Sequence, residues 1–382
     1  MIQMDNATRV LEAEIDTEGG PDAWFDPRES EDEFDFIQKI AIVFVGIIMV
    51  SLFWAAFEFF SSGILDDGPA ALVTSREAHF DSLTQFDDLS QYDGSGVSVC
   101  IVDSGIDLSH PDLANLELAS WTDFVEGKSE PYDDNGHGTM MAGILVADGG
   151  LTGLARGVDL HVAKALSGEG NGSDQTIADA IDWCRTKNVD IISLSLGGAP
   201  GVVPQFFGGD AAEGAANDAI DAGIVVIAAA GNDGGDDDGD VASPGSVASV
   251  ICVGGVDSSG NIWDGSSVGD NNGRVWPILL PRNSPDEKPE IVAPGKEVPV
   301  IIAGGGWGLA SGTSASTVYV TAAFAILFEA DPSLMGNDAQ SVEDLKYRMI
   351  DSSRMKQDQT EHDDYYGYGL LQTFELVNGS QS

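Results

Sequence analysis

The sequence feature that most constrains the fold is a regular alternation of short apolar runs and helical patterns, which begins near residue 95. The apolar runs are rich in β-branched residues and cover 97–102, 160–165, 189–196, 224–230 and 247–253. The helical patterns between them cover 139–147, 174–187 and 211–222. Continuous apolar strands separated by helices are typical of a parallel sheet that is covered on both faces. The sequence therefore predicts an α/β fold with a mostly parallel central sheet, whose ligands bind beyond the carboxyl ends of the strands.

The N-terminal part of the chain differs from this pattern. Residues 1–38 hold twelve acidic residues and show little periodicity, and we expect a solvated, disordered tail. Residues 40–57 are 18 consecutive positions without a charge, which is long enough to cross a bilayer. This run predicts a single transmembrane helix over 39–60, with the lipid bilayer as its partner. A cleaved signal peptide is disfavoured because the segment lacks a short basic start and an Ala-x-Ala-type site, and a buried core helix is the alternative.

The basic residues around this segment predict its orientation. Arg28 and Lys39 precede it, and the next basic residue is Arg76. Because Lys and Arg favour the cytoplasmic side, we expect the N-terminus inside the cell and the large domain outside the cell membrane. Residues 61–90 are interpreted as an irregular polar linker and domain entry, and residues 91–378 as the α/β domain.

The charge of the chain excludes one class of partner. The sequence holds 63 acidic residues against 17 Lys and Arg, for a formal net charge of −46. Its hydrophobic fraction of 43% is that of a protein with a core, so the charge does not indicate general disorder. Such a surface repels nucleic acid and is tolerated mainly where salt screens it. We therefore expect no nucleic-acid partner and infer adaptation to high salt, of the haloarchaeal type.

The three cysteines are Cys100, Cys184 and Cys252. Their number is odd and none of them forms a C-x-x-C pair. Two lie in apolar runs and one lies in a helical pattern, so we expect three buried free thiols rather than a disulfide framework.

Two polar side chains stand where predicted elements begin or end. Asp103 ends the first apolar run in the segment CIVDSGID, and a carboxylate there needs hydrogen-bond partners. His137 lies between two glycines at the start of a helical pattern, in the segment DNGHGT. Flanking glycines allow close approach of the backbone and leave the imidazole uncrowded. The alternatives are an aspartate that caps a turn and a histidine with a structural role. The other four histidines lack such settings.

Two more candidates follow later in the chain. Ser314 lies in the small-residue turn SGTSAS before the long apolar run 318–328, which we expect to form a buried helix. Unpaired N–H groups and the helix dipole at such a position can stabilise an oxyanion, although helix caps often have the same composition. Asn232 lies beyond a strand end in the segment AAAGND, as a turn residue or as an amide donor. The segment 195–198 (SLGG) suits pairing with an extended peptide.

Together these segments resemble the subtilisin-like serine proteases. The order Asp, His, Ser is that of the family. Its three motifs are present as DSG at Asp103, HGT at His137 and GTS ending at Ser314, and AAGN ends at Asn232 as its oxyanion-hole asparagine does. The resemblance covers about residues 75–376 and implies a subtilisin-like three-layer fold. It also implies that an extended substrate binds between two walls, namely Ser195, Leu196 and Gly197 on one side and Gly170 and Gly172 on the other.

The implied activity is that of a serine endopeptidase acting on polypeptides. In this family Ser314 would be the nucleophile, His137 the base and Asp103 the residue that orients the imidazole. Asn232 and the Ser314 N–H would bind the oxyanion. A catalytically silent binding protein of the same fold at the membrane is the alternative. An esterase is disfavoured because the G-x-S-x-G elbow is absent.

The chain departs from the family pattern at several positions. It has Ser316 where the family usually has Ala, Val318 where it has Pro, and Met140 where a His is frequent. We expect these positions to pack rather than react. The family's calcium-binding loop is shortened to residues 147–153, so no cofactor is predicted. The acidic run 233–240 could hold calcium, but a solvated loop is the favoured interpretation.

Overall fold

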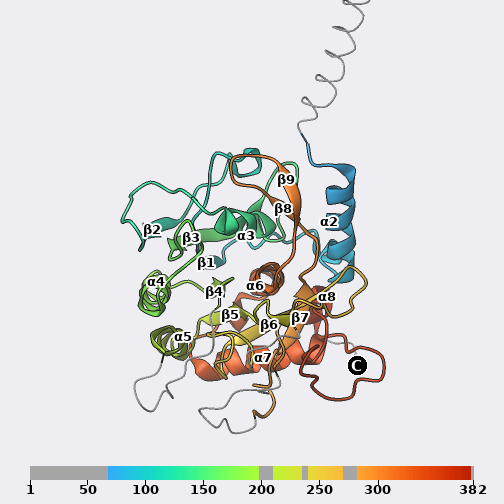
Figure 1. The fold of residues 1–382 in the computed structure, drawn as a ribbon. Coiled ribbons are helices and arrows are strands. Elements are labelled where there is room, and N and C mark those ends of the chain that lie inside the picture. Colours follow the sequence, from blue (N-terminus) through green and yellow to red (C-terminus); the bar gives the residue numbers. More distant parts are fainter. Residues whose placement is uncertain (1–67, 198–209, 235–239, 270–281, 380–382) are drawn as a thin grey trace, which may run out of the picture. The chain divides into compact units, whose positions relative to one another are not determined.

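The structure is a computed structural model that describes residues 68–197, 210–234, 240–269 and 282–379 (Figure 1). The predicted acidic tail, the predicted transmembrane helix over 39–60 and the first residues of the predicted linker lie outside this part of the chain. The described residues belong to one structural unit that begins at Gly68.

A seven-stranded parallel sheet forms the centre of the domain, as the apolar runs predict (Figure 1). The strands are β1 (Ser98–Asp103), β2 (Ser120–Asp123), β3 (Asp159–Lys164), β4 (Ile191–Leu194), β5 (Val225–Ala229), β6 (Ile251–Val256) and β7 (Ile291–Pro294). Their order is β2-β3-β1-β4-β5-β6-β7, and all neighbouring pairs are parallel. Five strands overlap the predicted runs. Strands β2 and β7 were not predicted, because β2 has the mostly polar sequence SWTD and β7 has the short sequence IVAP, which ends in proline.

Helices cover both faces of this sheet. They are α3 (His137–Val146), α4 (Asp174–Thr186), α5 (Ala211–Asp221) and α6 (Thr313–Ala330). Side chains alternate across a strand, so Val99 and Ile101 of β1 pack in one apolar cluster with α3 and α6. Cys100 and Val102 point the other way and pack in a second cluster with α4 and α5. The three-layer α/β fold expected from the sequence is thereby confirmed.

Helix α6 is the central helix of the core. Nearly all of its residues are buried. Within the described ranges it is the one helix long and apolar enough to cross a membrane, and its burial marks it as the core helix that the run 318–328 predicts. Its N-terminus carries Ser314.

Smaller elements surround this core. They are α2 (Ala71–Leu83), β8 (Val298–Ile301), β9 (Trp307–Ala310), α7 (Ala339–Ser352), α8 (Thr373–Asn378) and the 3₁₀ turns η2 (Asp87–Leu89), η3 (Pro111–Leu113) and η6 (Pro332–Leu334). Strands β8 and β9 form an antiparallel hairpin. The prediction of an irregular stretch within 61–90 is wrong for α2 and η2. Helix α2 has only two buried residues, Val73 and Phe80, so its sequence shows little apolar periodicity.

The prediction of three free thiols is also wrong. Cys100 of β1 and Cys184 of α4 form a disulfide across the interface between the sheet and the helix. The two residues are 84 positions apart, and only the folded packing of α4 on β1 brings them together. Cys252 is free and buried, as expected.

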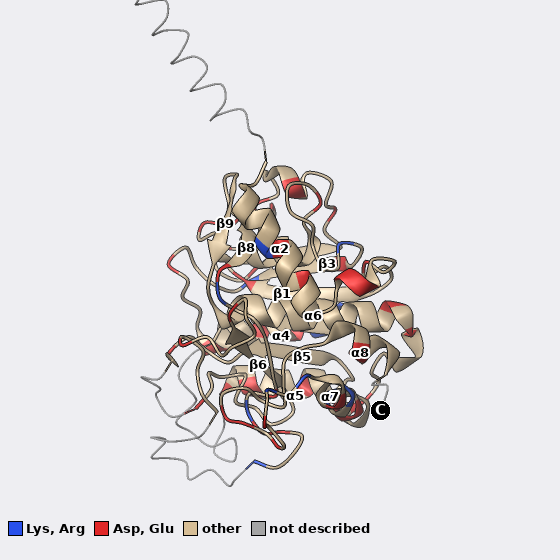
Figure 2. Cartoon of the chain, turned by 90° about the vertical axis from the view of Figure 1, so that its right-hand side faces the viewer, with Lys and Arg blue, Asp and Glu red and all other residues tan. Residues whose placement is uncertain are grey.

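Acidic residues lie on helices and loops all around the domain (Figure 2). Basic residues are few, and several of them are buried in ion pairs rather than exposed. Lys164, Lys288 and Lys346 are each almost fully buried. Five acidic residues are buried as well, namely Asp103, Asp112, Asp123, Asp240 and Glu290. The exposed residues of the described part therefore keep the acidic excess of the composition.

Candidate active site

The predicted catalytic residues gather at the carboxyl edge of the sheet. Asp103 is the last residue of β1, and Asn232 lies three residues beyond the end of β5. His137 is the first residue of α3, and Ser314 is the second residue of α6. This is the edge where ligands bind in parallel α/β folds, so the topology alone brings residues from distant parts of the chain to one place.

Asp103 and His137 form the best-defined contact of the site. The Nδ1 atom of His137 lies 2.8 Å from Oδ1 and 3.0 Å from Oδ2 of Asp103. The Asp103 side chain is fully buried, whereas the His137 side chain is 29% exposed. The main-chain N–H of Ser104 also donates to Asp103 Oδ1, at 2.7 Å. A carboxylate on Nδ1 keeps the proton there and leaves Nε2 free to accept another.

The charge of Asp103 raises the pKa of His137 above its ordinary value of 6.5. Burial of the ring opposes this effect, because it disfavours the charged imidazolium. The hydrogen bond to Asp103 and the more distant charge of Asp133 also raise the pKa. The site thus stabilises the imidazolium that a general base forms when it takes a proton.

The glycines around His137 are required by close backbone contacts. A Cβ atom on Gly138 would lie 2.2 Å from the carbonyl oxygen of Gly105. Gly105 itself has a φ of +120°, and a Cβ there would lie 2.0 Å from the carbonyl oxygen of Tyr132. Larger residues would push the turn after Asp103 away from the helix that starts at His137.

Ser314 and Ser195 form a reciprocal pair of hydrogen bonds. The Ser314 hydroxyl donates to the Ser195 carbonyl at 3.2 Å, and the Ser195 hydroxyl donates to the Ser314 carbonyl at 3.1 Å. Both side chains are buried. The structure thus joins the Ser314 hydroxyl to the residue after β4 and shows no hydrogen bond between Ser314 and His137, so this bond has to be exchanged before an imidazole can take the proton.

The amide of Asn232 is oriented by the residue that precedes the predicted nucleophile. Its Oδ1 accepts the main-chain N–H of Thr313 at 2.9 Å, and the Thr313 hydroxyl lies 3.1 Å from the same oxygen. Because the carbonyl end of the amide is held, the NH₂ end is left as the donor. The Thr313 hydroxyl also lies 3.1 Å from the Gly231 carbonyl, which ties the start of α6 to the loop after β5.

The two predicted substrate walls differ in character. Ser195 and Leu196 directly follow β4 and are buried, whereas Gly197 is exposed. Gly170 and Gly172 are exposed residues of a turn that begins after β3. The same turn contacts the His137 loop, because Asn135 Nδ2 donates to the Gly168 carbonyl at 3.0 Å. The structure therefore connects each predicted wall to one part of the candidate active site.

Several supporting residues were missed by reasoning from the sequence. Asp133 accepts hydrogen bonds from the N–H groups of Gly136 and Thr139, from the Thr139 hydroxyl and from the Ser104 hydroxyl. Burial raises the pKa of Asp133, but these hydrogen bonds outweigh burial and the net pKa is lowered. An aspartate four residues before His137, near the start of a helical pattern, is a signal that could have identified this cap.

The departures from the family pattern pack as expected. Val318 is fully buried in α6. The Ser316 hydroxyl is also buried, and it lies 3.1 Å from the carbonyl oxygens of Ala293 and Pro294 at the end of β7. The extra hydroxyl therefore has acceptors, and it anchors the first turn of α6 to the sheet.

The shortened loop 147–153 does not fit a calcium ion. Calcium needs six to eight oxygen ligands that are free to face it. Both carboxylate oxygens of the buried Asp112 instead accept N–H donors. Oδ1 accepts from Gly150 at 2.7 Å, and Oδ2 accepts from Leu151 at 2.9 Å and from the Trp307 indole at 2.7 Å. Glu77 of α2 accepts the Thr152 N–H. Within the described residues no group of three His, Cys, Asp or Glu could hold a metal ion, and residues 235–239 of the acidic run lie outside that part.

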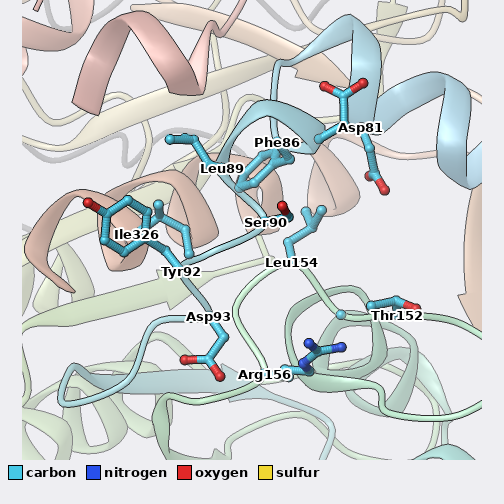
Figure 3. Close-up of a pocket in the computed structure, with 12 residues that line it drawn as sticks. Asp81, Phe86, Leu89, Ser90, Tyr92, Asp93, Thr152, Leu154, Arg156 and Ile326 are labelled. Carbon is cyan, nitrogen blue, oxygen red and sulfur yellow. The ribbon is translucent and has the colours of Figure 1, made fainter. Parts of the chain in front are cut away.

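A separate pocket of about 170 Å³ lies away from these residues (Figure 3). Its lining comes from α2, η2, the segment before β1 and the shortened loop, and it includes Asp81, Asp93 and Arg156. None of the four predicted catalytic residues lines it. The pocket is therefore not the candidate active site.

Comparisons with known sequences identify relatives of this chain. The profile of the subtilase family (Peptidase S8) matches residues 94–369. Subtilisin NAT of Bacillus subtilis subsp. natto is 34% identical over 247 residues, and the match spans 63% of this chain but only 58% of that protein. Subtilisin of Bacillus pumilus is 33% identical over 285 residues, which are 73% of this chain and 90% of that protein.

Solved structures share the fold. Sphericase superposes with a TM-score of 0.59 at 28% identity, covering 74% of this chain and 92% of that one. A cold adapted subtilisin-like serine proteinase superposes with a TM-score of 0.57 at 25% identity, covering 74% and 90%. The family profile covers well over half of the sequence and includes all four predicted catalytic positions. The chain belongs to the subtilase family.

Proposed function

We propose that the chain is a serine endopeptidase that hydrolyses peptide bonds in polypeptide substrates. The observation that carries the proposal is the contact between the His137 imidazole and the buried Asp103, at the sheet edge where Ser314 begins the core helix. Family membership supports the same activity. A base with a raised pKa and a hydroxyl at a helix N-terminus, both at one sheet edge, are suitable groups for acyl transfer.

The first half of the reaction forms an acyl-enzyme. The Ser314 hydroxyl turns away from the Ser195 carbonyl, and its oxygen attacks the carbonyl carbon of the peptide bond. His137 Nε2 takes the proton, and Asp103 holds the Nδ1 proton and stabilises the imidazolium. The oxyanion accepts hydrogen bonds from the Ser314 N–H and the Asn232 amide. When the tetrahedral intermediate collapses, His137 gives its proton to the leaving amine, and a water molecule then repeats the cycle to release the acid.

Substrate binding uses the two walls beside these residues. We place an extended peptide between the segment Ser195, Leu196 and Gly197 and the turn that holds Gly170 and Gly172. Gly197 offers an exposed backbone directly beyond the buried end of β4. Pairing through main-chain hydrogen bonds would orient the substrate with little dependence on its side chains.

The location of the enzyme is part of the proposal. Residues 39–60 anchor the chain in the cell membrane as a single-pass helix, and the catalytic domain faces the outside in high salt. The disulfide between Cys100 and Cys184 supports the exported location, because disulfides persist mainly in oxidising compartments. The excess of 63 acidic over 17 basic residues, which lie on many helices and loops in Figure 2, supports adaptation to high salt, where their repulsion is screened.

A fluorophosphonate probe in molar KCl tests the activity. We expect the wild-type protein to be labelled and Ser314→Ala not to be labelled. Ser316→Ala is the matched control, since it removes a neighbouring hydroxyl that hydrogen-bonds to the end of β7 at a position where the family usually has Ala, and it should be labelled like the wild type. Peptide cleavage, mapped by mass spectrometry, should likewise occur with the wild type and Ser316→Ala but not with Ser314→Ala. A folded wild-type protein that is never labelled at any salt concentration would instead be a silent binding protein.

The oxyanion site is tested by Asn232→Ala. In a subtilisin, removal of the asparagine donor lowers kcat by about 10²–10³, and we expect a loss of this order here. KM should change little, because the amide interacts most strongly with the oxyanion of the transition state. Steady-state cleavage of one peptide by the folded variant measures both constants. An unchanged kcat would remove Asn232 from the mechanism.

A further inference from the structure

Lys164 is a fully buried lysine next to the candidate active site. It ends β3 and lies in register with Asp103 on the neighbouring strand β1. Its ammonium group has three hydrogen-bond acceptors, which are the carbonyls of Ser104 at 2.6 Å and Leu166 at 2.8 Å and the carboxylate of Asp134 at 2.6 Å. An ammonium has three N–H donors, so the group is fully satisfied. A buried lysine does not contribute to solubility, and this one lies next to Asp103, the carboxylate that contacts His137. Both facts suggest a role for Lys164 in the active site.

Ser104 connects this lysine to Asp103 and to the first turn of α3. Its N–H donates to Asp103, and its hydroxyl accepts the Gly138 N–H and donates to Asp133, each at 2.9 Å or less. Its carbonyl is the group that accepts from Lys164. Ser104 is thus held by four hydrogen bonds. Those with Asp103 and Gly138 link Asp103 to the first turn of α3, which begins at His137.

We propose that Lys164 is a positioning residue for the hydrolytic reaction, which holds the Ser104 main chain so that Asp103 and His137 keep their hydrogen-bonded geometry. This inference rests on the proposed protease function. Lys164 also reaches the His137 loop from the other side, because Asp134 precedes His137 by only three residues. Release of the ammonium would free the turn after Asp103 and the loop before His137 together.

In high salt the three contacts of Lys164 should differ in how strongly they hold its ammonium group in place. The Asp134 side chain is 40% exposed, so its ion pair with Lys164 is screened by molar salt. The two carbonyl contacts are buried and are screened much less. The positioning effect should therefore persist at the salt concentrations where the protein works.

The chain contains a matched control for this lysine. Lys346 is 1% exposed, and its ammonium also has three acceptors, namely the Ala248 carbonyl at 2.7 Å, Asp286 at 2.7 Å and Glu290 at 2.8 Å. Its aspartate partner is 36% exposed, much like that of Lys164. No contact of Lys346 reaches a predicted catalytic residue. Loss of either lysine should lower stability, but only loss of Lys164 should affect the reaction.

The experiment compares two double variants that keep the net charge of the protein. The first is Lys164→Met with Asp134→Asn, and the second is Lys346→Met with Asp286→Asn. Removal of both members of an ion pair minimises the direct effect of charge on His137, which is faced by Asp103 and Asp133. Peptide cleavage in molar KCl gives kcat, KM and the midpoint of the acid limb, and circular dichroism gives the folded fraction.

We expect the first double variant to lose about 10- to 100-fold in kcat with KM within threefold, since small misplacements of catalytic groups can cost up to about 10²-fold. Its acid-limb midpoint should fall toward 6.5, because a looser contact with Asp103 stabilises the imidazolium less. The second variant should keep kcat within threefold and keep the midpoint. A first variant with kcat within twofold of the wild type, or an equal kcat loss in both, would overturn the proposal.

Two further measurements test the proposal if the first double variant does not fold or if the wild type is inactive. If the first double variant does not fold, Lys164→Arg retains the charge and the donors, but its planar fork should not reach all three acceptors. We expect about a tenfold lower kcat for it, and an unchanged kcat would overturn the proposal. If the wild type has no activity, the proposed function fails. An NMR titration of His137 then still tests Lys164, because only the first double variant should shift the midpoint.

Discussion

Asp103 and Asp112 lie nine residues apart and are both buried, but they accept hydrogen bonds from different kinds of donor. The Asp103 carboxylate accepts from the His137 imidazole and from one main-chain N–H. The Asp112 carboxylate accepts from two main-chain N–H groups and from the Trp307 indole. An imidazole titrates near neutral pH, whereas amides and indoles do not. One carboxylate is therefore coupled to proton transfer, and the other holds a loop in place.

The hydrogen-bond donors around a buried carboxylate therefore determine whether it is coupled to proton transfer or stabilises a loop. Asp103 is the last residue of β1 and Asp112 lies in η3, and each accepts a hydrogen bond from a side chain that is distant in the sequence. Substitution of each aspartate should separate chemistry from stability.

Asp103→Asn should lower kcat by about 10⁴, the size of loss known for a triad aspartate when its imidazole is held in the wrong tautomer. The asparagine is close in shape to the aspartate, so the protein should remain folded. Active-site titration and peptide cleavage in molar KCl measure the loss. Asp112→Asn is the matched control and should keep kcat within threefold in its folded fraction. Similar losses in the two variants would show that the difference in donors has no functional meaning.

The sequence predicts part of this arrangement, for identifiable reasons. Five strands lie within or overlap long apolar runs and could be recognised, whereas β2 is mostly polar and β7 is a short segment that ends in proline. Asp103, His137 and Ser314 lie at predicted element ends, and the structure places them at one sheet edge. The residues that orient the site, such as Thr313 and Lys164, act through tertiary contacts with Asn232, Ser104 and Asp134, and such contacts leave no local pattern in the sequence. The Cys100–Cys184 disulfide was missed for the same reason, since it depends on how α4 packs on β1.

The pH dependence of kcat/KM should reveal which of the two carboxylates is coupled to a titrating group. His137 must be neutral to act as a base, and Asp103 raises its pKa above 6.5. The value of kcat/KM should therefore fall about tenfold per pH unit below a midpoint that lies above 6.5. The ion pair of the protonated ring stabilises the fold below pH 6.5, and this contribution is lost as the pH rises through the raised pKa. Asp112→Asn should keep the same midpoint. A midpoint at or below 6.5 in the wild type would contradict the assigned coupling.

The stability of the loop after α3 should depend on Asp112 and Trp307. Asp112→Asn leaves buried N–H donors without an acceptor, and Trp307→Phe removes one donor from the carboxylate. Each change should lower the free energy of unfolding by about 1–3 kcal/mol. Denaturant unfolding in molar KCl measures this, and the two losses should not be additive because the residues are in contact. Trp121→Phe is a control, since its indole donates to an exposed carbonyl and its loss should cost less.

Addition of calcium should have the smallest effect on stability, because Asp112 is not available as a calcium ligand. Its two carboxylate oxygens are already directed at N–H groups, so a cation could bind only after these three hydrogen bonds had broken. Millimolar calcium and a chelator should therefore shift the Tm of the wild type and of Asp112→Asn by the same amount. Both proteins need the same KCl concentration, because salt screening alone changes the stability of so acidic a domain. If calcium raised the Tm of the wild type and this response disappeared in Asp112→Asn, the loop would bind the metal and the distinction between the two carboxylates would have to be redrawn.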